Sequence, residues 1–286
     1  KRISTGAFAG SGIRELVIPD GVVSIGGKAF ADCKTLRRVY VPESVTEIAA
    51  DAFDFCSSLT NIAVSENNET YASVDGMLLN KDRTRVILVP AGKTGTVVVP
   101  EGVTDIGPDA FLNVTASSVV LPASLETIYN DAFLNCSVEQ LTVRSSAMYV
   151  SPSAFYGCES LYAVFSGGSV RDSLRNAMAS SRLSVDKIQF LDFGQTPQIL
   201  WTTEDDGAGG VVVTDVSPAL ATVVVPDEID GRRVTAIGEG FLQNNIRITS
   251  ISLPGGLSRI EDYAFRGCEG VASITWRGAG PVVIGN

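Results

Sequence analysis

Apolar residues recur along this chain in short segments where buried and exposed positions alternate. In residues 36–41 (LRRVYV), Val39 and Val41 lie two residues apart. Side chains two apart on a strand point to the same face, so both valines should face a core and Tyr40 should face outward. Pro42 then lacks the backbone N–H needed to continue a ladder. The pattern predicts short β-strands that end at a proline.

A second element, usually an Ala-Phe pair, recurs between these strands. Its phenylalanines, called the Phe column below, are Phe8, Phe30, Phe53, Phe111, Phe133, Phe155, Phe241 and Phe265. Their successive spacings are 22, 23, 58, 22, 22, 86 and 24 residues. A period of 22–24 lies in the range of roughly 20–29 residues that is typical of leucine-rich repeats. We therefore expect a leucine-rich-repeat solenoid, mostly β with short turns, in which each Phe is buried against neighbouring coils.

The first interruption of the period lies between Phe53 and Phe111. Residues 77–80 and 85–89 have the composition of two strands, and Lys81-Asp82 lies between them. This arrangement predicts a β-hairpin inserted into the array at about residues 70–92.

The second interruption lies between Phe155 and Phe241. Val170, Leu174, Ala177 and Met178 would share one helical face, which predicts a helix at about 170–181. Ser169 followed by Asp172 resembles a capping box at its start. Strands with a turn at 205–210 then restart the array. We accordingly divide the chain into an array at 1–166, a helix-containing connector at 167–197 and a second array at 198–286.

Charge and hydropathy exclude several classes of partner. The chain has 22 basic and 32 acidic side chains and a net charge of −10. This balance argues against nucleic-acid binding and against docking on anionic lipid. No segment has the length and hydropathy of a membrane span, so we expect no membrane insertion. The chain starts at Lys1 without Met, and we expect that a signal peptide or an upstream segment has been removed.

The cysteines occupy one repeated position. Each lies three residues after a column Phe; they are Cys33, Cys56, Cys136, Cys158 and Cys268. Other coils have Ser11, Val114 or Asn244 there, which indicates a small packing position. The alternatives are a disulfide framework or a metal site, but the count is odd and Cys-x-x-Cys pairs are absent. We expect free, buried thiols.

Other features give little support for catalysis. The chain has no histidine, which excludes Ser-His-Asp, Cys-His and His-metal sites. The triplet Asp192-Phe193-Gly194 matches a kinase element but lacks the other kinase motifs. The acidic run at 204–206 (EDD) lacks the alternating spacing of a calcium loop, so a solvated turn is favoured. We expect no catalytic residue, no cofactor and no metal.

The repeat frame, for example residues 48–59 (IAADAFDFCSSL), resembles that of the BspA-like leucine-rich-repeat family of bacterial surface proteins. The resemblance extends over nearly the whole chain. It implies an extracellular or cell-surface location and attachment to host matrix proteins or to other cells. Adhesion or protein binding is thus the first functional hypothesis. A structural spacer with no ligand of its own is the alternative, and a glycosidase with paired carboxylates is a third.

Two groups of outward positions are candidate binding sites. Arg14, Arg37, Arg38 and Tyr40, called the basic patch below, should lie together on the first two long strands. Tyr162 and Phe165, with Ala163 between them, should face outward just before the helix. Exposed Tyr and Arg are frequent interface anchors, and guanidinium groups bind carboxylates and sulfates. The expected partner is a protein or an acidic glycan of the host or of a neighbouring cell.

Structural explanations compete with both sites. Glu15 could pair with Arg38 across neighbouring strands, and the helix could cover Phe165.

Overall fold

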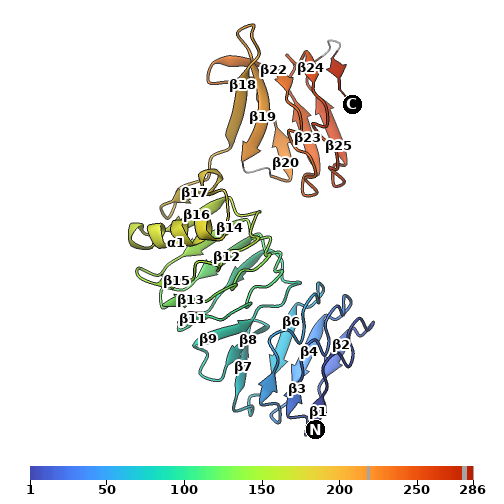
Figure 1. Ribbon diagram of the computed structural model, residues 1–286, viewed down its shortest axis with the longest axis vertical. Helices are drawn as coiled ribbons and strands as arrows, with labels where there is room; N and C mark the ends of the chain where they lie inside the picture. The colour runs from blue at the N-terminus through green and yellow to red at the C-terminus, as the bar shows by residue number, and fades with distance from the viewer. Residues whose placement is uncertain (218–219, 279–281, 286) are drawn as a thin grey trace. The chain divides into compact units, whose positions relative to one another are not determined.

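The computed structural model describes residues 1–217, 220–278 and 282–285, and the chain forms two compact units. Unit 1 comprises Lys1–Pro197 and unit 2 comprises Gln198–Asn286. Both are stacks of β-coils, so the predicted solenoid is confirmed (Figure 1). None of the helices in the described part of the chain has the length and apolar character needed to cross a bilayer.

The first coils of unit 1 build two parallel three-stranded sheets. Each coil contributes a long strand to one sheet and a two-residue strand to the other. The long strands are β2 (Glu15–Val17), β4 (Arg38–Val41) and β6 (Asn61–Val64), and the short ones are β1 (Arg2–Ile3), β3 (Ser24–Ile25) and β5 (Glu47–Ile48). Inward side chains such as Val39 and Ile62 are buried in the core between them.

An antiparallel meander interrupts the coils. It consists of β7 (Tyr71–Val74), β8 (Met77–Asn80) and β9 (Arg85–Leu88). The predicted hairpin of β8 and β9 is confirmed, while β7 is an additional strand. Strand β8 is buried on both faces, because Leu78 packs into the core of the first coils whereas Met77 and Leu79 pack into the core of the following ones.

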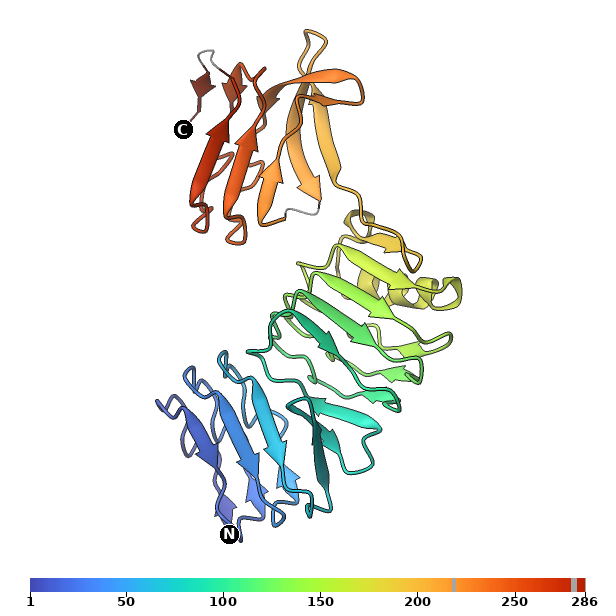
Figure 2. The ribbon, with the colours of Figure 1, turned by 180° about the vertical axis from the view of Figure 1, so that it is seen from behind.

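The remaining coils of unit 1 again contribute long and short parallel strands, in sheets separate from those of the first coils. The long strands are β10 (Thr96–Val98), β12 (Ser118–Leu121), β14 (Gln140–Val143), β16 (Ala163–Ser166) and β17 (Gln189–Leu191), paired in that order. The short strands β11 (Asp105–Ile106), β13 (Thr127–Ile128) and β15 (Tyr149–Val150) join the meander through β9. The long-strand sheet therefore ends at β6 and restarts at β10 (Figure 2).

Helix α1 (Gly168–Ser180) follows β16, and a short 3-10 helix (Val185–Lys187) precedes β17. The helix and its buried face of Val170, Leu174, Ala177 and Met178 are confirmed. The predicted capping box is wrong, because the helix begins earlier. Gly167 is the N-cap, and the Ser169 hydroxyl instead donates to the carbonyl of Ser146 at 2.6 Å.

Unit 2 begins with an antiparallel hairpin and then resumes parallel coils. The hairpin is β18 (Leu200–Asp205) and β19 (Val211–Ser217), as the sequence predicts. The later strands are β20 (Thr222–Val224), β21 (Glu228–Ile229), β22 (Arg232–Ile237), β23 (Ser250–Leu253), β24 (Arg259–Ile260), β25 (Ser273–Trp276) and β26 (Val283–Ile284). Strands β20, β23 and β25 form one sheet, and β18, β19, β22, β24 and β26 form the other, with β21 paired to β22.

The Phe column is divided into three stacks. Phe111, Phe133 and Phe155 stack with ring centroids 4.5 and 5.1 Å apart, and all are buried. Phe30 lies between Phe8 and Phe53 in the first stack. The expectation that every column Phe is buried is wrong for Phe8, which is 46% exposed in the first coil, and for Phe265, which is half-buried. In unit 2, Phe241 and Phe265 meet edge to face at 6.1 Å.

Candidate binding surface

The structure brings the residues of the basic patch together on the outer face of the β2-β4-β6 sheet. The Arg37 amide donates to the Arg14 carbonyl at 2.7 Å, which places these two residues side by side. Tyr40 lies in register with Val17, and both side chains are exposed, by 41% and 70%. Val17 therefore adds apolar area to the patch, although sequence reasoning did not include it.

The charges of the basic patch are only partly compensated. Arg38 forms an ion pair with Glu15 at 3.8 Å, as the competing explanation expects. Both side chains are largely exposed, so the pair contributes little free energy and leaves Arg38 available to a stronger partner. Arg14 and Arg37 are exposed and have no ion pair within the described residues.

The second predicted group is less accessible. Tyr162 and Phe165 are half-buried, and the Tyr162 hydroxyl accepts a hydrogen bond from Gln140 at 2.6 Å. Ala163 occupies an outward position by register but is buried, because its small side chain lies between Gln140 and Gln189.

Phe165 lies in register between Thr142 and Leu191. Strand β17, and not the helix, is therefore its neighbour in the sheet. Tyr162 and Phe165 are thus less exposed to solvent than Val17 and Tyr40.

The cysteines perform a structural role that spacing alone does not reveal. The thiol of Cys33 donates to the carbonyl of Phe8 at 3.2 Å, one coil earlier, and Cys56 bonds to Phe30 in the same way at 3.1 Å. Burial raises the pKa of the Cys56 thiol to about 12. These thiols are hydrogen-bond donors between coils and are not nucleophiles.

Cys136 and Cys158 form the closest thiol pair. Their sulfur atoms lie 3.1 Å apart, which is well beyond the S–S bond length of about 2.05 Å, and both thiols are free. The hydrogen bond with Cys136, together with burial, raises the pKa of Cys158. The fifth cysteine, Cys268, is half-buried, so the expectation of full burial is wrong there.

The carboxylates of the acidic turn in unit 2 accept hydrogen bonds from neighbouring protein groups. Asp206 accepts hydrogen bonds from the Ala208 and Gly210 amides and from the Thr235 hydroxyl, and Asp205 bonds to Arg232 at 2.7 Å. These contacts, led by Thr235, lower the pKa of Asp206. Among the described residues, no group of three metal-ligating side chains is found. The carboxylates of Asp205 and Asp206 are therefore engaged by the turn itself and by Arg232 and Thr235 of strand β22.

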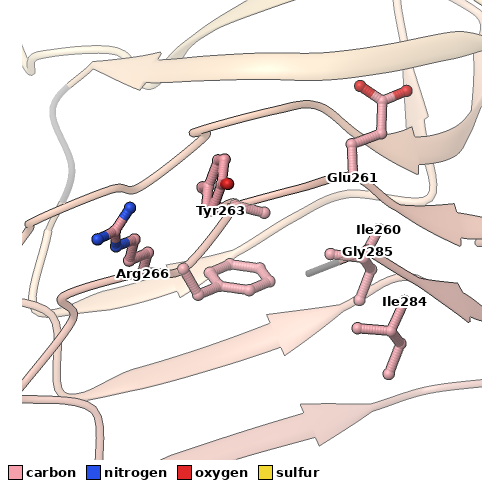
Figure 3. A pocket seen from close by; sticks show the side chains of 8 residues that line it. Ile260, Glu261, Tyr263, Arg266, Ile284 and Gly285 are labelled. Carbon is pink, nitrogen blue, oxygen red and sulfur yellow. The ribbon is translucent and has the colours of Figure 1, made fainter.

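Unit 2 also carries an open pocket of about 420 Å³ (Figure 3). It is lined by Ile260, Glu261, Tyr263, Ala264, Phe265, Arg266, Ile284 and Gly285. Glu261 is engaged by Arg259 at 2.9 Å, and the guanidinium of Arg266 lies over the Tyr263 ring. Phe111 and Phe133 are each covered by the column Phe of the next coil, whereas no further Phe covers Phe265 within the described residues. The pocket therefore corresponds to an open coil surface.

Comparison with known proteins agrees with this architecture. The chain matches the BspA type leucine-rich repeat region in six copies, over residues 1–74, 92–194 and 228–279. The unmatched segments include the β8–β9 hairpin and the β18–β19 hairpin. No curated protein is significantly similar to the chain.

Several solved structures are similar to the chain. A leucine-rich repeat protein from Eubacterium ventriosum is 18% identical, with a TM-score of 0.50, over 99% of this chain and 66% of that one. A leucine-rich cell surface protein from Faecalibacterium prausnitzii is 20% identical, with a TM-score of 0.44, over 96% and 63%. The chain thus spans less than two thirds of the length of either protein. At 18% identity, the likeness to the Eubacterium ventriosum protein shows the fold alone. Since the family profile matches most of its length, the chain is a member of the BspA-type leucine-rich-repeat family.

Proposed function

We propose that this chain is a non-enzymatic binding module on a bacterial surface, and that the basic patch is its contact site for an acidic partner. One observation carries the proposal. Arg14 and Arg37 are exposed and form no ion pair with any described residue, and they lie beside the exposed Tyr40 on a chain whose net charge is −10.

The chemistry of the basic patch supports this partner class. Guanidinium groups bind carboxylates and sulfates through paired N–H donors. Tyr40 and Val17 supply rigid apolar area next to those charges, a combination that is typical of interface hot spots. The surface location follows from the family resemblance, and repeat arrays commonly bind through their extended faces.

The test is a binding assay against immobilised host matrix proteins and against carboxylated and sulfated glycans. Arg37→Glu combined with Arg38→Glu should weaken binding about tenfold or more, and added salt should weaken it further, because exposed charges are screened. Arg83→Glu combined with Arg144→Glu is the matched control, since it changes the net charge equally at exposed positions outside the patch.

Equal binding by both double variants would exclude the basic patch as the contact site. Absence of binding to either class of ligand would favour a structural spacer.

A further inference from the structure

One aromatic residue departs from the conformational rule of its coil. Two residues after the column Phe, the backbone has a positive φ in six other coils, where the residue is Gly, Asp or Asn. These types tolerate the left-handed region best. The third coil instead has Phe55, with φ of 58° and 59% of its surface exposed. Core packing does not explain why an exposed aromatic residue occupies this strained backbone position.

Phe55 lies at the edge of a small groove where its coil meets the insertion. The groove has a volume of about 20 Å³, and most of the residues that line it are apolar. They are Ala50, Phe53, Asp54, Phe55, Leu59, Leu88, Val89, Ala91, Asp109 and Leu112. A volume of this size holds a group comparable to one water molecule. The occupant is therefore the tip of a single side chain and not a larger ligand.

The charged residues of the groove indicate which kind of side chain it would bind. Asp54 and Asp109 are its only charged lining residues, and both are acidic. Neither has an ion pair within the described residues. Burial raises the pKa of Asp54, and the carboxylates of Asp51 and Asp109 raise it further, while Lys28 opposes them only in part. A cation placed here would relieve this repulsion.

We propose that the groove beside Phe55 binds a lysine side chain from a protein partner. The compact ammonium group fits the small volume between the carboxylates, and its aliphatic stem packs along the apolar wall. The exposed ring of Phe55 then provides a face for the cation and a rigid contact for the partner's backbone. This site is separate from the basic patch and has the opposite charge.

The test uses the full chain and two end-blocked peptides that are identical except at one residue, which is lysine or Nε-acetyl-lysine. Binding is followed by the NMR amide shifts of residues 50–55 and 109–112, at peptide concentrations up to about 10 mM. The lysine peptide should shift these resonances and bind at least about fivefold more tightly than the acetylated peptide, because acetylation removes the positive charge and enlarges the tip of the side chain. Equal shifts by both peptides, or none by either, would overturn the proposal.

Two variants separate binding from folding. Phe55→Asn installs the residue type of other coils, so it should weaken lysine-peptide binding while leaving the denaturation midpoint unchanged or higher. Phe193→Asn, at an exposed Phe outside the groove, should leave binding unchanged. A clearly lower midpoint for Phe55→Asn would show that the ring merely packs the gap at the insertion. The double charge reversal in the basic patch should not change the binding of the lysine peptide. A negative result at one proposed site therefore does not refute the other.

Discussion

Truncating Phe133 to alanine should cost about 4–5 kcal/mol of folding free energy. The side chain is fully buried, and its ring stacks on Phe111 at 4.5 Å and on Phe155 at 5.1 Å. Burial of a Phe contributes about 1.5–3 kcal/mol. The cavity and the lost ring contacts bring the cost of a Phe→Ala change to the upper part of the usual 3–5 kcal/mol.

Phe8→Ala is the matched control, because Phe8 occupies the same repeat position. It is 46% exposed and has one stacked neighbour at 5.3 Å, so its loss should cost only about 1–2 kcal/mol. The measurement is urea unfolding followed by far-UV circular dichroism. Tryptophan fluorescence, which arises only from Trp201 and Trp276, identifies any separate transition of unit 2. If the two variants lose the same stability, ring stacking between coils does not hold the array together as we argue.

Three further predictions concern thiols, charge and metal. Native protein should contain four unreactive thiols and a slowly reacting Cys268, and denaturation without reductant should expose five; any smaller number would reveal a disulfide. Asp109→Asn should raise the melting temperature at neutral pH, because burial and then Asp131 raise the pKa of Asp109 in the folded state. The folded state thus binds the Asp109 proton more tightly than the unfolded state does, and this contribution to stability is lost as pH rises through the raised pKa. The gain in melting temperature from Asp109→Asn should therefore shrink below about pH 4, where Asp109 is protonated in both states. A gain that does not change with pH would refute the charge argument. Chelator should leave the melting temperature unchanged, since protein groups already occupy the carboxylates of Asp205 and Asp206; a drop of several degrees would reveal a bound ion.

The sequence predicts the coils well because every coil repeats the same local requirements. Alternation fixes which strand residues face the core, and the period fixes which residues become neighbours. The side-by-side position of Arg37 and Arg14 follows from these two facts alone. The pairing of Glu15 with Arg38 follows from them as well, and the structure contains it.

The errors arise where neighbours differ from those of a regular coil. Strand β7 has a signal that we did not use: Asp75-Gly76 is a typical two-residue hairpin turn, and both residues have positive φ. Phe8 is exposed because only the second coil packs against its ring, whereas Phe53 and Phe155 are buried with one ring neighbour each. Ala163 is buried because its neighbours in the sheet are long. These outcomes depend on residues distant in sequence, so one segment read alone cannot predict them.

The candidate sites are harder to predict than the fold. Phe55 can be singled out in the sequence only after aligning the coils, which shows an aromatic residue where others have Gly, Asp or Asn. Its exposure and the groove beside it depend on how the insertion packs against the third coil. A solenoid sequence reports its repeat strongly, whereas its function resides in the departures from that repeat.

The two-sided burial of β8 has a consequence for how the array can evolve. In a stacked array each coil is stabilised by its immediate neighbours, so interactions do not extend far along the stack. Leu78 completes one core of unit 1, and Met77 and Leu79 complete the other. A coil duplicated or deleted on one side of β8 leaves the packing on the other side intact. The two blocks can therefore change length independently, and a lineage can enlarge one outer face while the other keeps its original coils.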